Sequence, residues 1–172
     1  IGLPLMIASA TVYRLNGYRP AHVGLVLGRK LALQLLVAVA GLGLGFMEYV
    51  ILRPEPLADT FSLQSIWFPA LILLVFTGFL EELIFRGLMQ RAAAEQFMKF
   101  GPLYISVLFA VLHIGYKSIL DLVFVFLVGF LFSVVAEKTR SLLGVTLAHG
   151  LTNISLFLIF PFILVSPLQI NL

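Results

Sequence analysis

The chain has 172 residues, of which 61% are hydrophobic and 11% are charged, with a formal net charge of +3 and no cysteine. A soluble domain carries about 25% charged residues, so this composition excludes an ordinary water-soluble globule, and the missing cysteines exclude disulfides and thiolate chemistry. The small net charge does not indicate a nucleic-acid partner, because in a membrane protein the positions of the basic residues carry the information.

Apolar runs that could cross a hydrocarbon core of about 30 Å recur along the chain. Because open strands do not span lipid and no β-barrel alternation is visible, they predict an all-α, polytopic bundle. The uncharged segment Ile1–Ala10 is interpreted as the remainder of a spanning helix that starts before Ile1, within one transmembrane domain over residues 1–172. About five spans follow, at Leu31–Ile51, Trp67–Leu80 with its continuation to Arg86, Leu103–His113, Leu120–Ala136 and Leu142–Val165. The last span is expected to bend or end at Pro161.

The basic residues give these spans an orientation. Nine of the eleven lie on one side of the predicted bundle: Arg14, Arg19, Arg29, Lys30, Arg86, Arg91, Lys99, Lys138 and Arg140. The other two, Arg53 and Lys117, lie in the alternate loops. By the positive-inside rule, the first set faces the cytoplasm.

Six polar residues lie inside the predicted spans, where ionisable groups are costly enough to be functional candidates by default. They occur in E-E-L-I-F-R (81–86), F-A-V-L-H (109–113) and H-G-L-T-N (149–153). Carboxylate, imidazole and amide groups are what is needed to activate water and to hold an oxyanion. The six residues are Glu81, Glu82, Arg86, His113, His149 and Asn153.

The first cluster predicts an ion pair beside a free carboxylate. Adjacent residues on a helix point about 100° apart, so Glu81 and Glu82 cannot serve one site equally. Arg86 follows Glu82 by four residues and lies on the same face, which favours a pair between them. Glu81 would then face the bundle interior as a general base. A Glu82–Arg86 clip that only holds helices together is an equally good hypothesis for that pair.

The two histidines also have alternative interpretations. His113 follows Phe109 by four residues, so the phenyl ring is expected beside an imidazole that is either a hydrogen-bonded core group or a base. His149 and Asn153 are separated by about 6 Å along one helix face, which suits two donors aimed at one oxyanion. An interhelical hydrogen-bonded pair would explain them as well.

In this order, E-E-x-x-x-R, F-x-x-x-H and H-x-x-x-N resemble the CPBP family, the CAAX prenyl proteases and bacteriocin-processing (ABI) proteins, over roughly Trp67–Pro161. The resemblance implies a bundle of about eight helices in complete members and an intramembrane protease activity. It also implies that Glu81 and His113 activate water and that His149 and Asn153 form the oxyanion hole. Glu82, Arg86 and Phe109 would support that site. The short gaps between motifs favour a bacterial member in the cytoplasmic membrane and leave open whether its peptide or protein substrate is prenylated.

Family members are often described as metalloproteases, and Glu81, His113 and His149 could supply three zinc ligands. Because the chain has no helix-borne H-E-x-x-H, we favour water activation without a metal. Another hypothesis is a non-catalytic CPBP-like accessory or assembly subunit of a larger membrane complex. A haem protein with His113 and His149 as axial ligands is a third, and a transporter is disfavoured by the lack of repeats.

Overall fold

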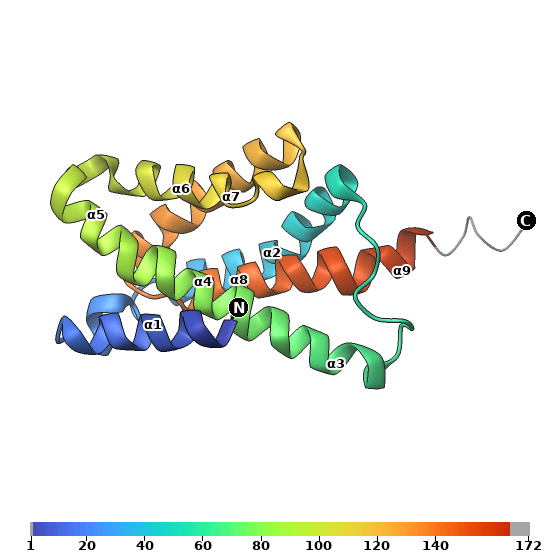
Figure 1. The fold of residues 1–172 in the computed structure, drawn as a ribbon, viewed down its shortest axis with the longest axis horizontal. Helices are drawn as coiled ribbons and strands as arrows, with labels where there is room; N and C mark the ends of the chain where they lie inside the picture. The colour runs from blue at the N-terminus through green and yellow to red at the C-terminus, as the bar shows by residue number, and fades with distance from the viewer. Residues whose placement is uncertain (1, 166–172) are drawn as a thin grey trace, which may run out of the picture.

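The structure, a computed structural model, describes residues 2–165, and all regular elements in that range are helical (Figure 1). This confirms the predicted all-α bundle. The α-helices are α1 (Gly2–Leu15), α2 (Leu31–Leu52), α3 (Leu63–Ile72), α4 (Leu80–Glu82), α5 (Gln90–Phe97), α6 (Gly101–Val111), α7 (Ile119–Thr139), α8 (Leu143–Ile154) and α9 (Phe160–Val165). Three π-helical segments, η2 (Leu73–Phe79), η3 (Leu83–Met89) and η6 (Ser155–Ile159), continue these helices. Short 3₁₀ turns are η1 (Pro20–Val23), η4 (Met98–Phe100) and η5 (Ile114–Tyr116).

Four stretches in the described range are long and apolar enough to cross a membrane: Leu31–Leu52, Leu63–Tyr116, Ile119–Thr139 and Leu143–Leu164. The second stretch holds two arms, a helix running from α3 through α5 and the shorter α6, which turns back at η4 (Figure 1). Many of the outward side chains are large and apolar, such as Leu36 and Val39 on α2. The protein is therefore an integral membrane protein.

Successive helices alternate in direction, so the ends that carry the basic residues meet at one end of the bundle (Figure 1). Backbone bonds tie this end together: the Arg29 N–H donates to Thr139 O at 2.6 Å, and the Leu142 N–H donates to Gly24 O at 2.8 Å. A side chain joins the same end to α5, where Arg91 Nη1 donates to His22 O at 3.4 Å. The asymmetric distribution of basic residues along the sequence therefore corresponds to one end of the folded bundle.

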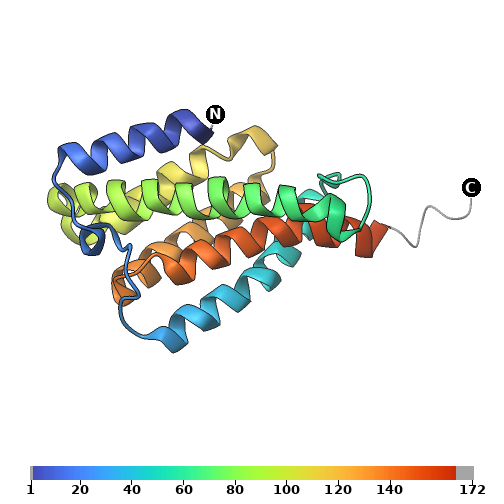
Figure 2. The same cartoon turned by 90° about the horizontal axis from the view of Figure 1, so that it is seen from below.

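Helix α8 lies between α2 and the helix that contains η2 (Figure 2). On the α2 side, a Cβ atom added to Gly41 would collide with Ala148 O, and one added to Gly45 would collide with Thr152 O. Thr152 Oγ1 donates to Gly41 O at 3.1 Å across this contact. Small residues four positions apart let membrane helices approach backbone to backbone, which is how α2 and α8 pack.

Pro161 does not end the last helix, so the first of the two expected effects, a bend or an end, is the one that remains. The helix continues through η6 and α9, with Pro161 at the second residue of α9. A proline inside a helix lacks the N–H that would bond the carbonyl four residues earlier, which here belongs to Phe157. That carbonyl instead accepts the Leu57 N–H at 3.0 Å, from the loop after α2. The freed backbone acceptor is thus satisfied, and the helix continues.

The close contact between α2 and α8 predicts a position-specific defect. Gly41→Val should lower the free energy of unfolding by about 1–3 kcal/mol, because the added methyl groups force the two backbones apart. Gly43→Val is the matched control, since a Cβ atom there meets nothing within 4 Å. Thermal unfolding of both variants in detergent micelles tests this, and equal melting temperatures would show that α2 and α8 do not depend on the glycine contact.

Candidate functional site

Glu81 and Glu82 lie on α4, a single helical turn between the π-helical segments η2 and η3. A π-helical segment widens the helix and often occurs at functional sites. The helix continues without a break through the two junctions. There the backbone N–H groups of Leu80 and Gln90 donate hydrogen bonds to the carbonyls of Val75 and Phe85, five residues earlier. The two carboxylates are thus placed on a locally widened helix in the middle of the bundle.

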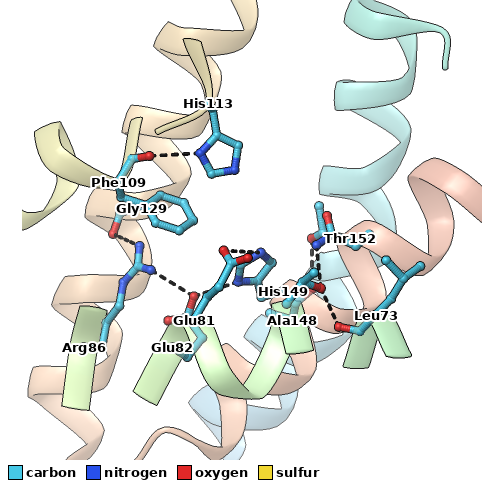
Figure 3. A network of polar contacts seen from close by, with 12 residues as sticks. Leu73, Glu81, Glu82, Arg86, Phe109, His113, Gly129, Ala148, His149 and Thr152 are labelled. Atoms are coloured by element: carbon cyan, nitrogen blue, oxygen red, sulfur yellow. Dashed lines mark hydrogen bonds and ion pairs between the residues drawn. The ribbon is translucent and has the colours of Figure 1, made fainter. Parts of the chain in front are cut away.

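Glu82 is at the centre of a buried polar network (Figure 3). Its Oε1 accepts a hydrogen bond from Arg86 Nη1 at 2.9 Å and one from His149 Nδ1 at 2.8 Å, and its side chain has no exposed surface. The predicted Glu82–Arg86 ion pair is therefore confirmed. Because a carboxylate oxygen only accepts hydrogen bonds, Nδ1 of His149 carries a hydrogen, and Nε2 is the ring atom that can act elsewhere.

Glu81 lies on the other side of the His149 ring (Figure 3). Its Oε2 is 4.0 Å from His149 Nε2, and 31% of its side chain is exposed. His149 is its one ion-pair partner among residues 2–165. Adjacent carboxylates on α4 thus contact opposite nitrogens of one imidazole, and only the carboxylate of Glu81 is reachable from outside.

The guanidinium of Arg86 is buried among carbonyl and aromatic groups. Its Nη2 donates to Gly129 O at 3.0 Å, on α7. Its central carbon lies 4.3 Å from the ring centroid of Phe109 and 5.9 Å from that of Phe132. Hydrogen bonds and aromatic faces replace part of the water that a buried cation loses. Arg86 therefore fixes Glu82, which in turn holds His149.

His113 lies two residues beyond the last residue of α6, in the turn before η5 and within the membrane-crossing stretch Leu63–Tyr116. The helix ends at Val111 because the chain turns sharply towards α7. His113 Nδ1 is 2.9 Å from Phe109 O, and a carbonyl only accepts, so Nδ1 carries the hydrogen and Nε2 has a free lone pair. The ring centroids of Phe109 and His113 are 4.8 Å apart, which confirms the predicted packing.

Asn153 lies one turn beyond His149 on α8, and its amide is held by a residue that the sequence analysis missed. Asn153 Nδ2 donates to Thr77 Oγ1 at 2.9 Å, while the Thr77 hydroxyl donates to Leu73 O. Thr77 is four residues before Glu81, so its place on the same helix face was the available signal. One amide hydrogen of Asn153 is used in this contact, and the second is left for a ligand.

Three of the four predicted catalytic residues line one small cavity of about 30 Å³: His113, His149 and Asn153. Glu81 is not part of its lining and reaches the site through His149. The lining also includes Glu48 on α2, which the sequence analysis did not single out. Glu48 is the one acidic or basic residue between Leu31 and Ile51, so the rule applied to the other spans would have found it.

The proposed zinc ligands do not gather in the way that a zinc site requires. Across residues 2–165, no group of three His, Asp or Glu side chains lies close enough together to hold a metal ion. Nδ1 of His149 bonds Glu82, and Nδ1 of His113 bonds a backbone carbonyl. Glu81, His113 and His149 therefore do not fit a ready-made three-ligand zinc site.

The ion pair predicts that Arg86 acts first on stability. Arg86→Ala leaves the Glu82 carboxylate buried without its cation, at a cost of about 3–5 kcal/mol, so the melting temperature in detergent should fall sharply. Lys99→Ala is the control, because this substitution removes the same charge from an exposed position on η4. An Arg86→Ala protein with unchanged melting temperature and selectively lost turnover would instead assign Arg86 to catalysis.

Comparison with known proteins identifies the family. Residues 63–155 match the sequence model of the family described as Type II CAAX prenyl endopeptidase Rce1-like. No curated protein matches the chain, and no solved structure matches it. The matched range contains the two glutamates of α4, both histidines of the site and Asn153. The chain belongs to the Rce1-like type II CAAX prenyl endopeptidase family.

Proposed function

We propose that this protein is an intramembrane endopeptidase that hydrolyses a peptide bond near the cytoplasmic membrane face, using water activated by Glu81 and His113. The observation that carries this proposal is the shared imidazole: Glu82 holds one nitrogen of His149 at 2.8 Å, and Glu81 lies 4.0 Å from the other. An orienting acid, an imidazole and a second, partly exposed acid form a plausible constellation for general-base hydrolysis.

Glu81 is the best-placed base because its carboxylate is partly exposed and lies outside the Glu82–Arg86 pair. His113 offers the free lone pair of Nε2 to the same reaction. The attacking water gives one proton to this base as its oxygen bonds to the carbonyl carbon, and the carbonyl π electrons move onto oxygen. The base then passes that proton to the leaving nitrogen as the C–N bond breaks. Such a base accounts for about 10²- to 10⁴-fold in rate.

In this proposal, His149 and Asn153 stabilise the negative charge that develops on the carbonyl oxygen of the substrate. His149 donates from Nε2 in its doubly protonated form, since its Nδ1 hydrogen is held by Glu82. Asn153 donates the amide hydrogen that Thr77 does not need. Donors fixed before the reaction stabilise an oxyanion at little reorganisation cost, and here both are held by neighbouring helices.

The substrate is a peptide or protein segment at the membrane, and the enzyme resides in a bacterial cytoplasmic membrane. The basic end of the bundle faces the cytoplasm in this proposal, in agreement with the positive-inside rule. The family description names a prenyl endopeptidase, so a prenylated peptide with a C-terminal CAAX sequence and its unprenylated counterpart are the first substrates to compare.

Glu81→Ala tests the base. In proteoliposomes, turnover of a fluorogenic peptide should fall by at least about 100-fold, because the acceptor for the proton of water is lost. The melting temperature should change little, since Glu81 is partly exposed and outside the Glu82–Arg86 pair. Glu95→Ala, which removes an exposed carboxylate on α5, should retain wild-type turnover. A folded wild-type protein that cuts neither form of the peptide under any condition would favour the accessory-subunit hypothesis instead.

Asn153→Ala tests the oxyanion hole. The substitution should lower kcat by about 100- to 1000-fold and leave KM nearly unchanged, because the donor acts on charge that exists only in the transition state. Thr77→Val, which frees the amide without removing it, should cost less than Asn153→Ala. If Asn153→Ala raises KM and leaves kcat unchanged, the amide binds substrate and is not an oxyanion donor.

A further inference from the structure

Glu48 is a buried carboxyl group that the reaction above does not use. It lies on α2 with only 6% of its surface exposed. Within residues 2–165, neither an ion pair nor a hydrogen bond engages its carboxyl group. A carboxyl group taken out of water without a partner costs several kcal/mol, and within a membrane span such a group is a functional candidate.

The side chain of Glu48 faces the reaction site. It lines the same cavity as His113, His149 and Asn153, although α2 contributes none of the predicted catalytic residues. Phe109, Phe124 and Phe132 form much of the remaining wall. Together with Thr152, five polar side chains from α2, α8 and the turn after α6 therefore converge on a cavity whose remaining lining is apolar.

The volume of this cavity indicates which molecule it can hold. A volume of about 30 Å³ is too small for an amino-acid side chain. A space that holds one water needs at least about 10–15 Å³, and the water needs two to four polar partners. The cavity meets both requirements, so a water molecule is the ligand that it fits.

We infer that Glu48 is a further catalytic residue, which accepts a hydrogen bond from the attacking water and fixes the position of its oxygen. The inference rests on the proposed function. Of the two water hydrogens, one is transferred to the base formed by Glu81 and His113, of which His113 lines the cavity, and is passed to the leaving nitrogen. The other remains on oxygen, points at Glu48, and ends in the new carboxylic acid. Glu48 itself gains and loses no proton.

Other titratable groups lie near Glu48 and must be held constant in any test. Asp121 on α7 and His149 on α8 interact with it electrostatically, and Tyr116 on η5 does so from the turn. Asp121 is fully buried, and neither of its carboxylate oxygens has a hydrogen-bond partner in the described range. None of these three groups forms a hydrogen bond or an ion pair with Glu48 in the described range, so its carboxyl group remains free to bind water.

Glu48→Ala, Glu48→Gln and Glu48→Asp, measured with the same peptide in proteoliposomes, test this role. Glu48→Ala should lower kcat by about 100-fold with unchanged KM, because the water is misplaced and peptide binding is not affected. Added formate should restore part of that loss by occupying the space of the missing carboxyl group, whereas chloride at equal ionic strength should not. Met47→Ala, on the lipid-exposed side of α2, is the control that should retain full turnover.

The conservative variants separate catalysis from structure. Gln keeps an acceptor oxygen at the same reach, whereas Asp withdraws it by one methylene, so turnover should rank Gln above Asp at similar melting temperatures. The inference is overturned if Asp outranks Gln, if Gln is as inactive as Ala, or if folded Glu48→Ala turns over normally. Should Glu48→Ala fail to fold, the order of Gln and Asp still decides.

Glu81→Ala is measured in parallel to separate the two proposals. Loss of turnover in Glu81→Ala with full turnover in Glu48→Ala rejects only the role of Glu48. A folded wild-type protein that cuts no peptide rejects both the proposed function and the role of Glu48.

Discussion

A guanidinium removed from water loses several kcal/mol of hydration even after the protein has relaxed around it. At Arg86 the protein replaces that hydration with one carboxylate, one backbone carbonyl and the faces of aromatic rings. The carboxylate, on Glu82, is thereby fixed at a single position, and its second hydrogen bond fixes His149. The orientation of the His149 imidazole therefore depends on Arg86, whose buried charge holds Glu82 in place.

This network forms only because two helices approach closely. A Cβ atom on Gly78 would lie 2.9 Å from Gly150 N, so η2 and α8 are in backbone contact one residue from His149. On its opposite face, α8 contacts α2 through Gly41 and Gly45. With α8 held from both sides, the side chains of Glu82 and His149 meet at 2.8 Å across the interface. The close helix contacts that these glycines allow thus bring the polar side chains of Glu82 and His149 together.

The site has an exposed side and a buried side. Glu81 keeps 31% of its side chain exposed, whereas Glu48 is buried against a cavity of about 30 Å³. The cavity on the buried side is large enough for one water molecule. His149 touches both sides, since it contacts Glu81 and also lines the cavity.

The sequence by itself determined the membrane class, the helical spans, the family motifs and the Glu82–Arg86 pair, because hydropathy and four-residue spacing are local properties. It could not fix the end of α6 at Val111, two residues before His113, since that end depends on where the chain turns to pack against α7. The contacts of His149 with Glu82, of Asn153 with Thr77 and of Glu48 with the cavity join residues far apart in the chain. Only tertiary packing decides such contacts, because periodicity assigns a side chain to a face of its helix but does not say which helix lies opposite.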